Sequence, residues 1–247
     1  MARLPRLVLP GHPHLVLQRG REGAHVFADD EDRRRYLEAL RQATRDSGVA
    51  LHGYVLMDDH VHLLATPVSE QSLSRAMQRV GRRYVSAFRA RHGGSGALFE
   101  GRFRAAPIEA EAFLLDCLRH LEQNPVRHGL VAAPEDYRWS SAAHHAGRRR
   151  DPLLTEHPMF WRLGNTPFER EAAWRAIGHA ALPPARARAI REACAKGWAL
   201  GGEAFLASAK RLTARRLAPL PRGRRASAGS NDSVPIRKAS SNRSDLL

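Results

Sequence analysis

Apolar residues recur at two different spacings along the first half of the chain. Short runs rich in valine and leucine occupy residues 14–20, 49–57 and 60–66, and such runs favour β-strands. Two aspartates at 58–59 separate the second run from the third, with the length and chemistry of a tight turn. These two strands should therefore pair antiparallel, and a last strand is expected at 104–108.

Three intervening segments place apolar residues at steps of three and four, which predicts amphipathic helices. The first should begin with Asp29 or Asp30 as its N-cap and end near Gly48. The second covers residues 70–91, and the third covers 111–124, where the next residue is a proline that closes the helix.

The order β-α-β-β-α-β-α predicts an α+β fold of ferredoxin-like type, an antiparallel sheet with helices packed on one of its faces. This domain is expected to span residues 1–147. Residues 217–247 are rich in Ser, Pro, Gly and Arg and are expected to form a disordered basic tail. Between the two, a helical accessory region is expected over 148–216, with helices at 167–180, 185–197 and 202–216.

Composition narrows the class of protein. The 247 residues carry a formal net charge of +15, and 43% of them are hydrophobic, which is too many for a wholly disordered chain. No run approaches 18 apolar residues, so we expect no membrane span and a cytoplasmic, nucleoid-associated location. Cys117 and Cys194 stand far apart without a C-x-x-C motif, which excludes a disulfide framework and a cysteine-based zinc site.

The positive charge is patterned along the chain. Residues 210–247 hold ten basic and two acidic side chains, whereas residues 1–147 hold 20 and 17. Within the latter, residues 75–104 hold eight arginines and one acid, with four aromatic residues interleaved: Tyr84, Phe88, Phe99 and Phe103.

Such a segment is commonly a solvated surface, but it is also typical of a groove for single-strand nucleic acid. In such a groove the phosphates contact arginine and the bases stack on aromatic rings. The candidate DNA contacts are six arginines: Arg75, Arg79, Arg82, Arg83, Arg102 and Arg104.

His60 and His62 are the main candidates for chemistry. Side chains two positions apart on a strand point to the same face, so two imidazoles can bind one divalent ion there. The neighbours of this pair are apolar, and an unpartnered imidazole among them would cost free energy. The alternative is a structural pair whose rings are satisfied by other hydrogen bonds.

His120 and Asn124 lie four positions apart on the third predicted helix. Their side chains therefore share one face and can reach the same point on the sheet. The alternative is a surface histidine and an asparagine that ends the helix before Pro125.

Three segments, in this order, resemble the REP-associated tyrosine transposases, which are chromosomal relatives of the small single-tyrosine HUH transposases. The segments are MDDHVHLLATP at 57–67, GRRYVSAFRARHGGSGALFEGRFRA at 81–105 and QNPVRHGLVAAPEDYRWSS at 123–141. The resemblance runs from about Pro10 to Gly147, and the helical remainder and the PRGR tail are also similar to longer family members.

The resemblance implies an HUH domain that recognises palindromic, hairpin-forming single-strand DNA and cleaves and joins the strand with a divalent metal. The HUH motif falls on His60 and His62, which together with Asn124 would hold Mg²⁺ or Mn²⁺ as a Lewis acid against the scissile phosphate. The arginine-rich segment would lie next to this site. No membrane partner is implied, and because family members work as monomers or dimers, a homodimer is left open.

His120 occupies the position of the family's nucleophilic tyrosine, four residues before the asparagine. Tyrosine attack gives a 5′-phosphotyrosine and a free 3′-OH, whereas the phosphoramidate formed by an imidazole would be more acid-labile. Three hypotheses follow. The protein is a transposase or single-strand DNA endonuclease that uses His120, a metal-activated water or Tyr84; it is an inactive descendant that binds hairpin DNA; or it is an RNA-binding regulator, because ferredoxin-like sheets also bind RNA.

Overall fold

The computed structural model describes residues 6–218. Its centre is a four-stranded antiparallel sheet in the order β2-β3-β1-β4, which is the ferredoxin-like order and confirms the predicted fold class. Apart from its first two residues, the predicted tail at 217–247 lies outside the described residues. The strands are β1 (His14–Arg19), β2 (Val49–Leu56), β3 (His60–Pro67) and β4 (Arg104–Pro107).

Two long helices, α1 (Asp30–Ser47) and α2 (Ser72–His92), pack together against one face of the sheet. The Asp29 carboxylate accepts a hydrogen bond from the backbone N–H of Asp32 at 2.9 Å and so caps α1, as its sequence predicts. Gly48 ends α1 in the left-handed conformation, with φ of 62°. Between the helices and the sheet, the rings of Tyr36 and Tyr84 meet edge to face, with centroids 5.2 Å apart.

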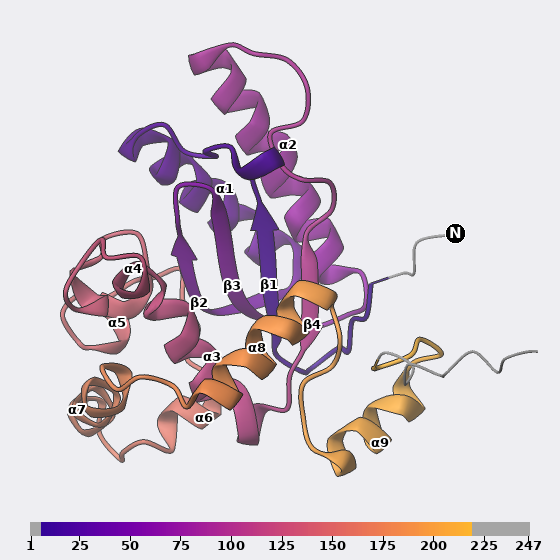
Figure 1. Cartoon of the computed structure of the whole chain (residues 1–247), viewed down its shortest axis with the longest axis vertical. Helices are drawn as coiled ribbons and strands as arrows, with labels where there is room; N and C mark the ends of the chain where they lie inside the picture. The colour runs from indigo at the N-terminus through magenta and orange to yellow at the C-terminus, as the bar shows by residue number, and fades with distance from the viewer. Residues whose placement is uncertain (1–5, 219–247) are drawn as a thin grey trace, which may run out of the picture.

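The opposite face of the sheet is also covered, so the expectation of helices on one face is wrong. In β1, the Gln18 side chain accepts a hydrogen bond from Tyr36 of α1, whereas the adjacent Leu17 points away toward α3 (Ala110–Glu122) and α8 (Pro184–Lys196). Figure 1 shows α8 lying across β1 and β4 on that side. The signal in the sequence was the unbroken run of Leu15 to Leu17, because strands buried on both faces lack alternation.

The accessory region is joined to the sheet domain by a shared hydrophobic core. Trp174, Ile190 and Leu200 belong to the same buried cluster as the strands, and Leu200 forms a parallel bridge with Ile108 just after β4. The three helices predicted here are present as α7, α8 and α9. Of these three, α7 covers Pro167–Gly178 and α9 covers Glu203–Leu212. The structure also contains three short helices, α4 (Asn124–Arg127), α5 (Ala142–His145) and α6 (Pro158–Trp161), and two 3₁₀ turns, η1 (Arg21–Gly23) and η2 (Pro134–Asp136).

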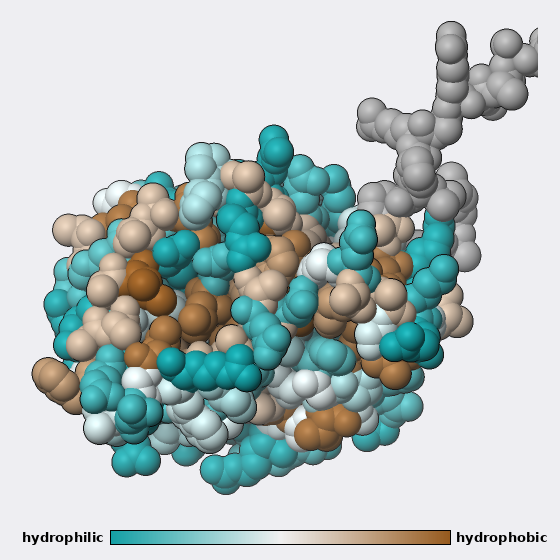
Figure 2. Space-filling view, turned by 90° about the horizontal axis from the view of Figure 1, so that it is seen from below, coloured by the Kyte–Doolittle hydropathy of each residue, from teal (hydrophilic) through white to brown (hydrophobic). Residues whose placement is uncertain are grey.

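Seen from below, the side of α7 and α9, the surface is mostly hydrophilic, with hydrophobic residues gathered in a few patches (Figure 2). Among the described residues, no helix combines the length and the apolar character that crossing a membrane requires.

Two buried histidines make the stability of this fold sensitive to mild acid. His14 donates from Nδ1 to the His12 carbonyl oxygen at 2.8 Å and accepts from the Leu9 N–H at 3.1 Å. His52 lies between the Thr155 carbonyl oxygen and the Thr66 hydroxyl. Burial lowers the pKa of each histidine from 6.5 to about 4.

Between pH 6.5 and pH 4 the unfolded chain therefore binds more protons than the folded chain, and the free energy of unfolding falls as the pH falls. We expect a loss of about 2 kcal/mol between pH 7 and pH 5.5 from this pair, measured by urea unfolding at constant ionic strength. An unfolding midpoint that does not change over this interval would contradict the prediction.

Candidate active site

His60 and His62 begin β3 and point to the same face of the sheet, as the strand periodicity predicts. Their rings are perpendicular, with centroids 5.2 Å apart. The Asp59 carboxylate, in the turn before β3, accepts a hydrogen bond from Nδ1 of His60 at 2.6 Å. This bond fixes the His60 tautomer and leaves the lone pair on Nε2.

Asn124 approaches this lone pair from the first position of α4. Its side-chain Nδ2 donates to Nε2 of His60 at 2.9 Å. α3 stops at Glu122, and α4 begins directly after Gln123, so Pro125 starts a new short helix instead of only ending the previous one. The Gln123 side chain donates to the carbonyl oxygens of Gly178 and Ala180 at 2.7 and 2.6 Å, which holds this corner in place.

His120 lies one turn before this corner, on α3, and faces His62. The two ring centroids are 6.4 Å apart, at an interplanar angle of 86°. Among the described residues no hydrogen bond to the His120 ring is present, although its backbone carbonyl accepts from Arg127 at 2.8 Å. Burial, with smaller contributions from Arg127 and Arg191, lowers the pKa of His120 to about 3, so its imidazole is neutral near pH 7.

The structure therefore brings together all four residues that the sequence singled out for chemistry, from β3, α3 and α4. Burial also lowers the pKa of His60 and of His62, so both rings are neutral near pH 7 and able to act as metal ligands. Two imidazoles and an amide oxygen are a donor set that suits a divalent ion, and His60, His62 and Asn124 are the residues that could hold one.

Several neighbours of the site could not be recognised from the sequence. Arg19 ends β1 directly opposite His60, so its cation lies on the side of the histidines. Its position follows from the register of β1 and β3, which no local pattern reveals. Cys194 of α8 approaches Nδ1 of His62, with Sγ 4.0 Å away. α8 thus helps to cover the site, in which His60, His62, His120 and Asn124 are each 4–9% exposed.

The six arginines proposed as DNA contacts divide into two groups. Arg79, Arg82 and Arg83 line a hollow between α1 and α2, on the face of the sheet away from His62. The prediction that these three arginines lie next to the metal site is therefore wrong, because α2 packs on one face of the sheet and the histidines of β3 point to the other face. Arg75, Arg102 and Arg104 instead lie along β4 and the adjoining end of α2.

The aromatic residues interleaved with these arginines are not stacking platforms. Tyr84, Phe99 and Phe103 are at most 8% exposed and belong to the core, and the Phe88 ring packs on His92. The spacing of these aromatic residues reflects packing between the helix and the sheet. In sequence alone, aromatic residues that pack in a core have the same spacing as aromatic residues on a binding surface, so the two could not be distinguished.

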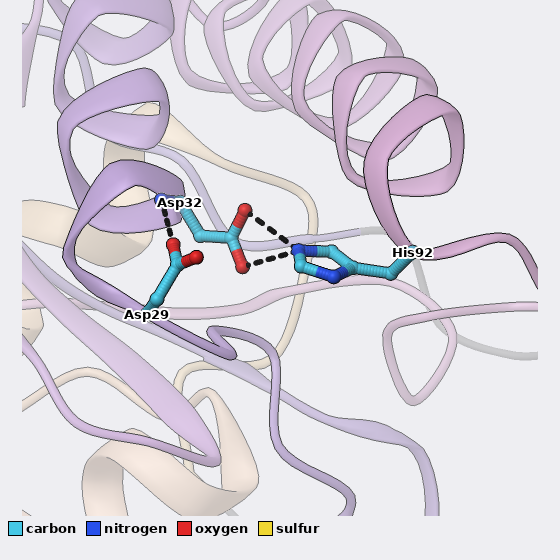
Figure 3. A group of neighbouring side chains, drawn as sticks. All are labelled: Asp29, Asp32 and His92. Atoms are coloured by element: carbon cyan, nitrogen blue, oxygen red, sulfur yellow. Dashed lines mark hydrogen bonds and ion pairs between the residues drawn. The ribbon is translucent and has the colours of Figure 1, made fainter.

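A second group of potential ligands lies away from these histidines, where the start of α1 meets the end of α2 (Figure 3). Nε2 of His92 lies 3.0 and 3.1 Å from the two carboxylate oxygens of Asp32, and Asp29 caps the same turn. Arg91 forms ion pairs with both aspartates. Because a guanidinium already neutralises these carboxylates, the group serves as a clamp between the two helices.

Comparison with known proteins gives one family match. Residues 11–113 match the family model described as IS200-like transposase. This segment contains His60 and His62 and ends before His120 and Asn124. No curated protein sequence matches the chain significantly.

Among the solved structures that resemble the chain are the following two. One is a REP-associated tyrosine transposase bound to a REP hairpin, with 17% identity and a TM-score of 0.52 over 64% of this chain and 93% of that one. The other, a proposed transposase from Deinococcus radiodurans R1, is 24% identical over 44% of this chain and 87% of its own, with a TM-score of only 0.33. The first likeness establishes the fold, and the second is too distant to add to it. The chain thus resembles the IS200-like transposase family over residues 11–113 and has the fold of a REP-associated tyrosine transposase.

Proposed function

We propose that this protein binds hairpin-forming single-strand DNA and catalyses metal-dependent cleavage and joining of the strand. The observation that carries the proposal is the convergence of His60, His62, Asn124 and His120 from three elements into one cluster. The family match supports a transposase-like action on DNA, and the structural relative was solved with a REP hairpin. The cluster is a feature of this chain's own geometry and is independent of either likeness.

A divalent metal, Mg²⁺ or Mn²⁺, would be held by His60, His62 and Asn124. When bound, it would act as a Lewis acid that stabilises charge on the phosphoryl oxygens of the scissile phosphate. The Asp59 carboxylate orients His60 for this role through the hydrogen bond to Nδ1. The Asn124 amide would turn its oxygen toward the ion, since its nitrogen now contacts Nε2 of His60 at 2.9 Å.

His120 is the protein's candidate nucleophile. A lone pair on the neutral imidazole attacks phosphorus, a P–N bond forms, and the P–O bond to the 3′ oxygen breaks. The 3′ oxygen leaves with the electron pair and takes up a proton from solvent, and the imidazolium loses its remaining N–H proton. The 5′ phosphate then stays on His120 as a phosphoramidate until a 3′-OH attacks it and joins the strand.

A second candidate, DNA binding without cleavage, is favoured by one observation. The four site residues are at most 9% exposed beneath α8, and the family's tyrosine is absent, so the chemistry needs both access and an unusual nucleophile.

The two candidates are separated by incubating the protein with oligonucleotides that contain a short hairpin and a single-strand flank, in the presence of Mn²⁺. The proposed activity gives a shortened strand on a denaturing gel, and EDTA prevents it. Tight binding of the hairpin with no cleavage at any Mn²⁺ or Mg²⁺ concentration would overturn the enzymatic proposal in favour of the binding one.

The variant His120→Tyr tests the nucleophile position directly. We expect this variant to form a covalent protein–DNA adduct that survives acid, because a phosphotyrosine ester resists acid whereas a phosphoramidate does not. The measurement is a shifted band of labelled DNA on a denaturing protein gel, with and without brief acid treatment. The double variant that also carries His60→Ala is the control, and an adduct of equal yield in this control would show that the attachment does not use the site.

A further inference from the structure

Two adjoining hollows follow the outer edge of β4, one of the two edge strands of the sheet. They share Arg6, Arg102 and Phe103, and we refer to them together as the β4 groove. One end lies beside the start of α2, and the other lies against the end of α8 and the segment after α9. Six cationic side chains line the groove: Arg6, Arg75, Arg102, Arg104, Lys196 and Arg215.

The lining carries strong positive charge. No carboxylate is among the described residues that line either hollow. Two acids lie nearby: Glu100 is 3.8 Å from Arg104, and Glu192 is 3.3 Å from Lys196. Both are exposed ion pairs, which contribute little and are readily exchanged for another anion.

Two of the cations are held in place by the fold. The Arg6 guanidinium lies 3.8 Å from the centroid of the Phe103 ring, and its Nε donates to the Phe103 carbonyl oxygen at 3.1 Å. Arg215 donates from Nη2 to the Gly197 carbonyl oxygen at 3.3 Å, while its buried Nε has no hydrogen-bond partner among the described residues. A buried guanidinium N–H without an acceptor costs free energy, and an anion in the groove would supply the acceptor.

The shape and chemistry of the groove fit a sugar–phosphate backbone better than bases. The two aromatic rings of the lining already carry a guanidinium: Arg6 lies 3.8 Å from the Phe103 centroid, and Arg215 lies 5.6 Å from the Trp198 centroid. These arginines compete with a base for the ring faces, so stacking is disfavoured. Arginine and lysine heads, in contrast, are suited to the regularly spaced phosphates of a nucleic acid.

The groove leads to the active site. Arg104 lies opposite Leu17 of β1, and Leu17 lies opposite His62 of β3, so the three side chains point to the same face. Since neighbouring strands are about 4.8 Å apart, Arg104 begins about 10 Å from the line of His62. Arg104 also donates to the Ala195 carbonyl oxygen of α8 at 2.8 Å, which ties the groove to the helix over the site.

We propose that the β4 groove binds the sugar–phosphate backbone of the DNA substrate, and that the accessory region, through Lys196 and Arg215, supplies part of this surface. The inference rests on the proposed function and assigns a surface to its substrate. It gives the accessory region a role that neither the family match, which ends at residue 113, nor the HUH motif contains. Contacts of this kind are independent of sequence, so they position the strand without selecting it.

The test measures the affinity of the full-length protein for a fluorescent DNA hairpin with a single-strand flank, by anisotropy, over a range of salt concentrations. The groove variant carries Arg102→Ala and Lys196→Ala, two exposed cations from the two parts of the chain. The control variant carries Arg34→Ala and Arg41→Ala, exposed arginines of α1 that lose the same charge. Circular dichroism melting confirms that both fold.

We expect the groove variant to bind about tenfold more weakly at physiological salt. The slope of log Kd against log salt should fall by about one for each phosphate that the variant no longer neutralises. The control variant should match wild type. If wild type binds the DNA and the groove and control variants have equal affinities and slopes, the proposal that the β4 groove binds DNA is wrong, and the proposed function is unaffected. Wild-type protein that fails to bind the DNA overturns both, and tighter binding of the equivalent RNA hairpin shows that the substrate class is wrong.

Discussion

Replacing His60 with alanine is expected to reduce metal-dependent cleavage of hairpin DNA at least about 100-fold, because a metal ion contributes several kcal/mol to the stabilisation of a phosphoryl transition state. His60 is the candidate metal ligand that both of its neighbours, Asp59 and Asn124, contact. Asp59 holds its Nδ1 at 2.6 Å, and Asn124 contacts its Nε2 at 2.9 Å. Without the imidazole, both the ligand and the group that orients Asn124 are gone. The measurement is the single-turnover rate at saturating protein and fixed Mn²⁺.

The matched control is His25→Ala, which removes an exposed histidine outside the cluster. We expect this control to cleave at the wild-type rate, and the affinity of His60→Ala for the hairpin in EDTA to equal that of wild type. If the single-turnover cleavage rate of His60→Ala lies within threefold of the wild-type rate, the cluster does not take part in cleavage.

Replacing Glu122 with leucine is expected to lower the free energy of unfolding by about 3–5 kcal/mol, because each buried donor left without an acceptor costs about 1–3 kcal/mol and the network couples its members. Glu122 lies between His120 and Asn124 in sequence, but its side chain is only 2% exposed and points away from the site. One carboxylate oxygen accepts from the Ser141 hydroxyl and from Nδ1 of His145, each at 2.6 Å. The other accepts from the Trp174 indole N–H at 3.1 Å.

Loss of the carboxylate leaves the buried N–H groups of His145 and Trp174 without an acceptor, whereas the Ser141 hydroxyl keeps the Tyr54 carbonyl oxygen at 3.3 Å. Urea unfolding at pH 7 should therefore show a much lower midpoint with an unchanged slope. Glu111→Ala, on the exposed face of the same helix, is the control and should change stability by less than about 1 kcal/mol. If the Glu122 variant is as stable as this control, the network does not hold α3.

The contacts of Glu122 connect the chemistry to the accessory region. Trp174 belongs to α7, yet it is bonded to the helix that carries His120. Gln123 likewise donates to the carbonyl oxygens of Gly178, the last residue of α7, and of Ala180 just after it. Trp174→Phe, which removes only the indole donor, isolates this link in the same unfolding experiment.

Much of the fold was predictable because it depends on neighbours in the chain. The four strands and the long helices follow from periodicity, and their ends differ from the predicted ones by one or two residues, except that α9 stops at Leu212, four residues short. The Asp29 cap and the left-handed Gly48 depend on a few adjacent residues. The shared direction of His60 and His62 follows from the alternation of a strand.

The assembled site, in contrast, depends on residues that are distant in sequence. The Asn124–His60 bond joins positions 64 residues apart, and the Cys194–His62 contact joins positions 132 apart. The division of the arginines between the α1–α2 hollow and the β4 edge was equally hidden, because a periodic stripe does not state which part of its helix lies beside the edge of a sheet.

The sequence by itself thus determined the elements, their caps and the candidate residues, since these depend on local backbone preference and the alternation of side chains. Only the tertiary structure decided that both faces of the sheet are buried, that α8 covers the histidines and that Lys196 and Arg215 complete a groove along β4. The physical reason is that hydrophobic burial is non-directional: it requires that apolar faces be covered, but the packing of the whole chain selects which element covers them.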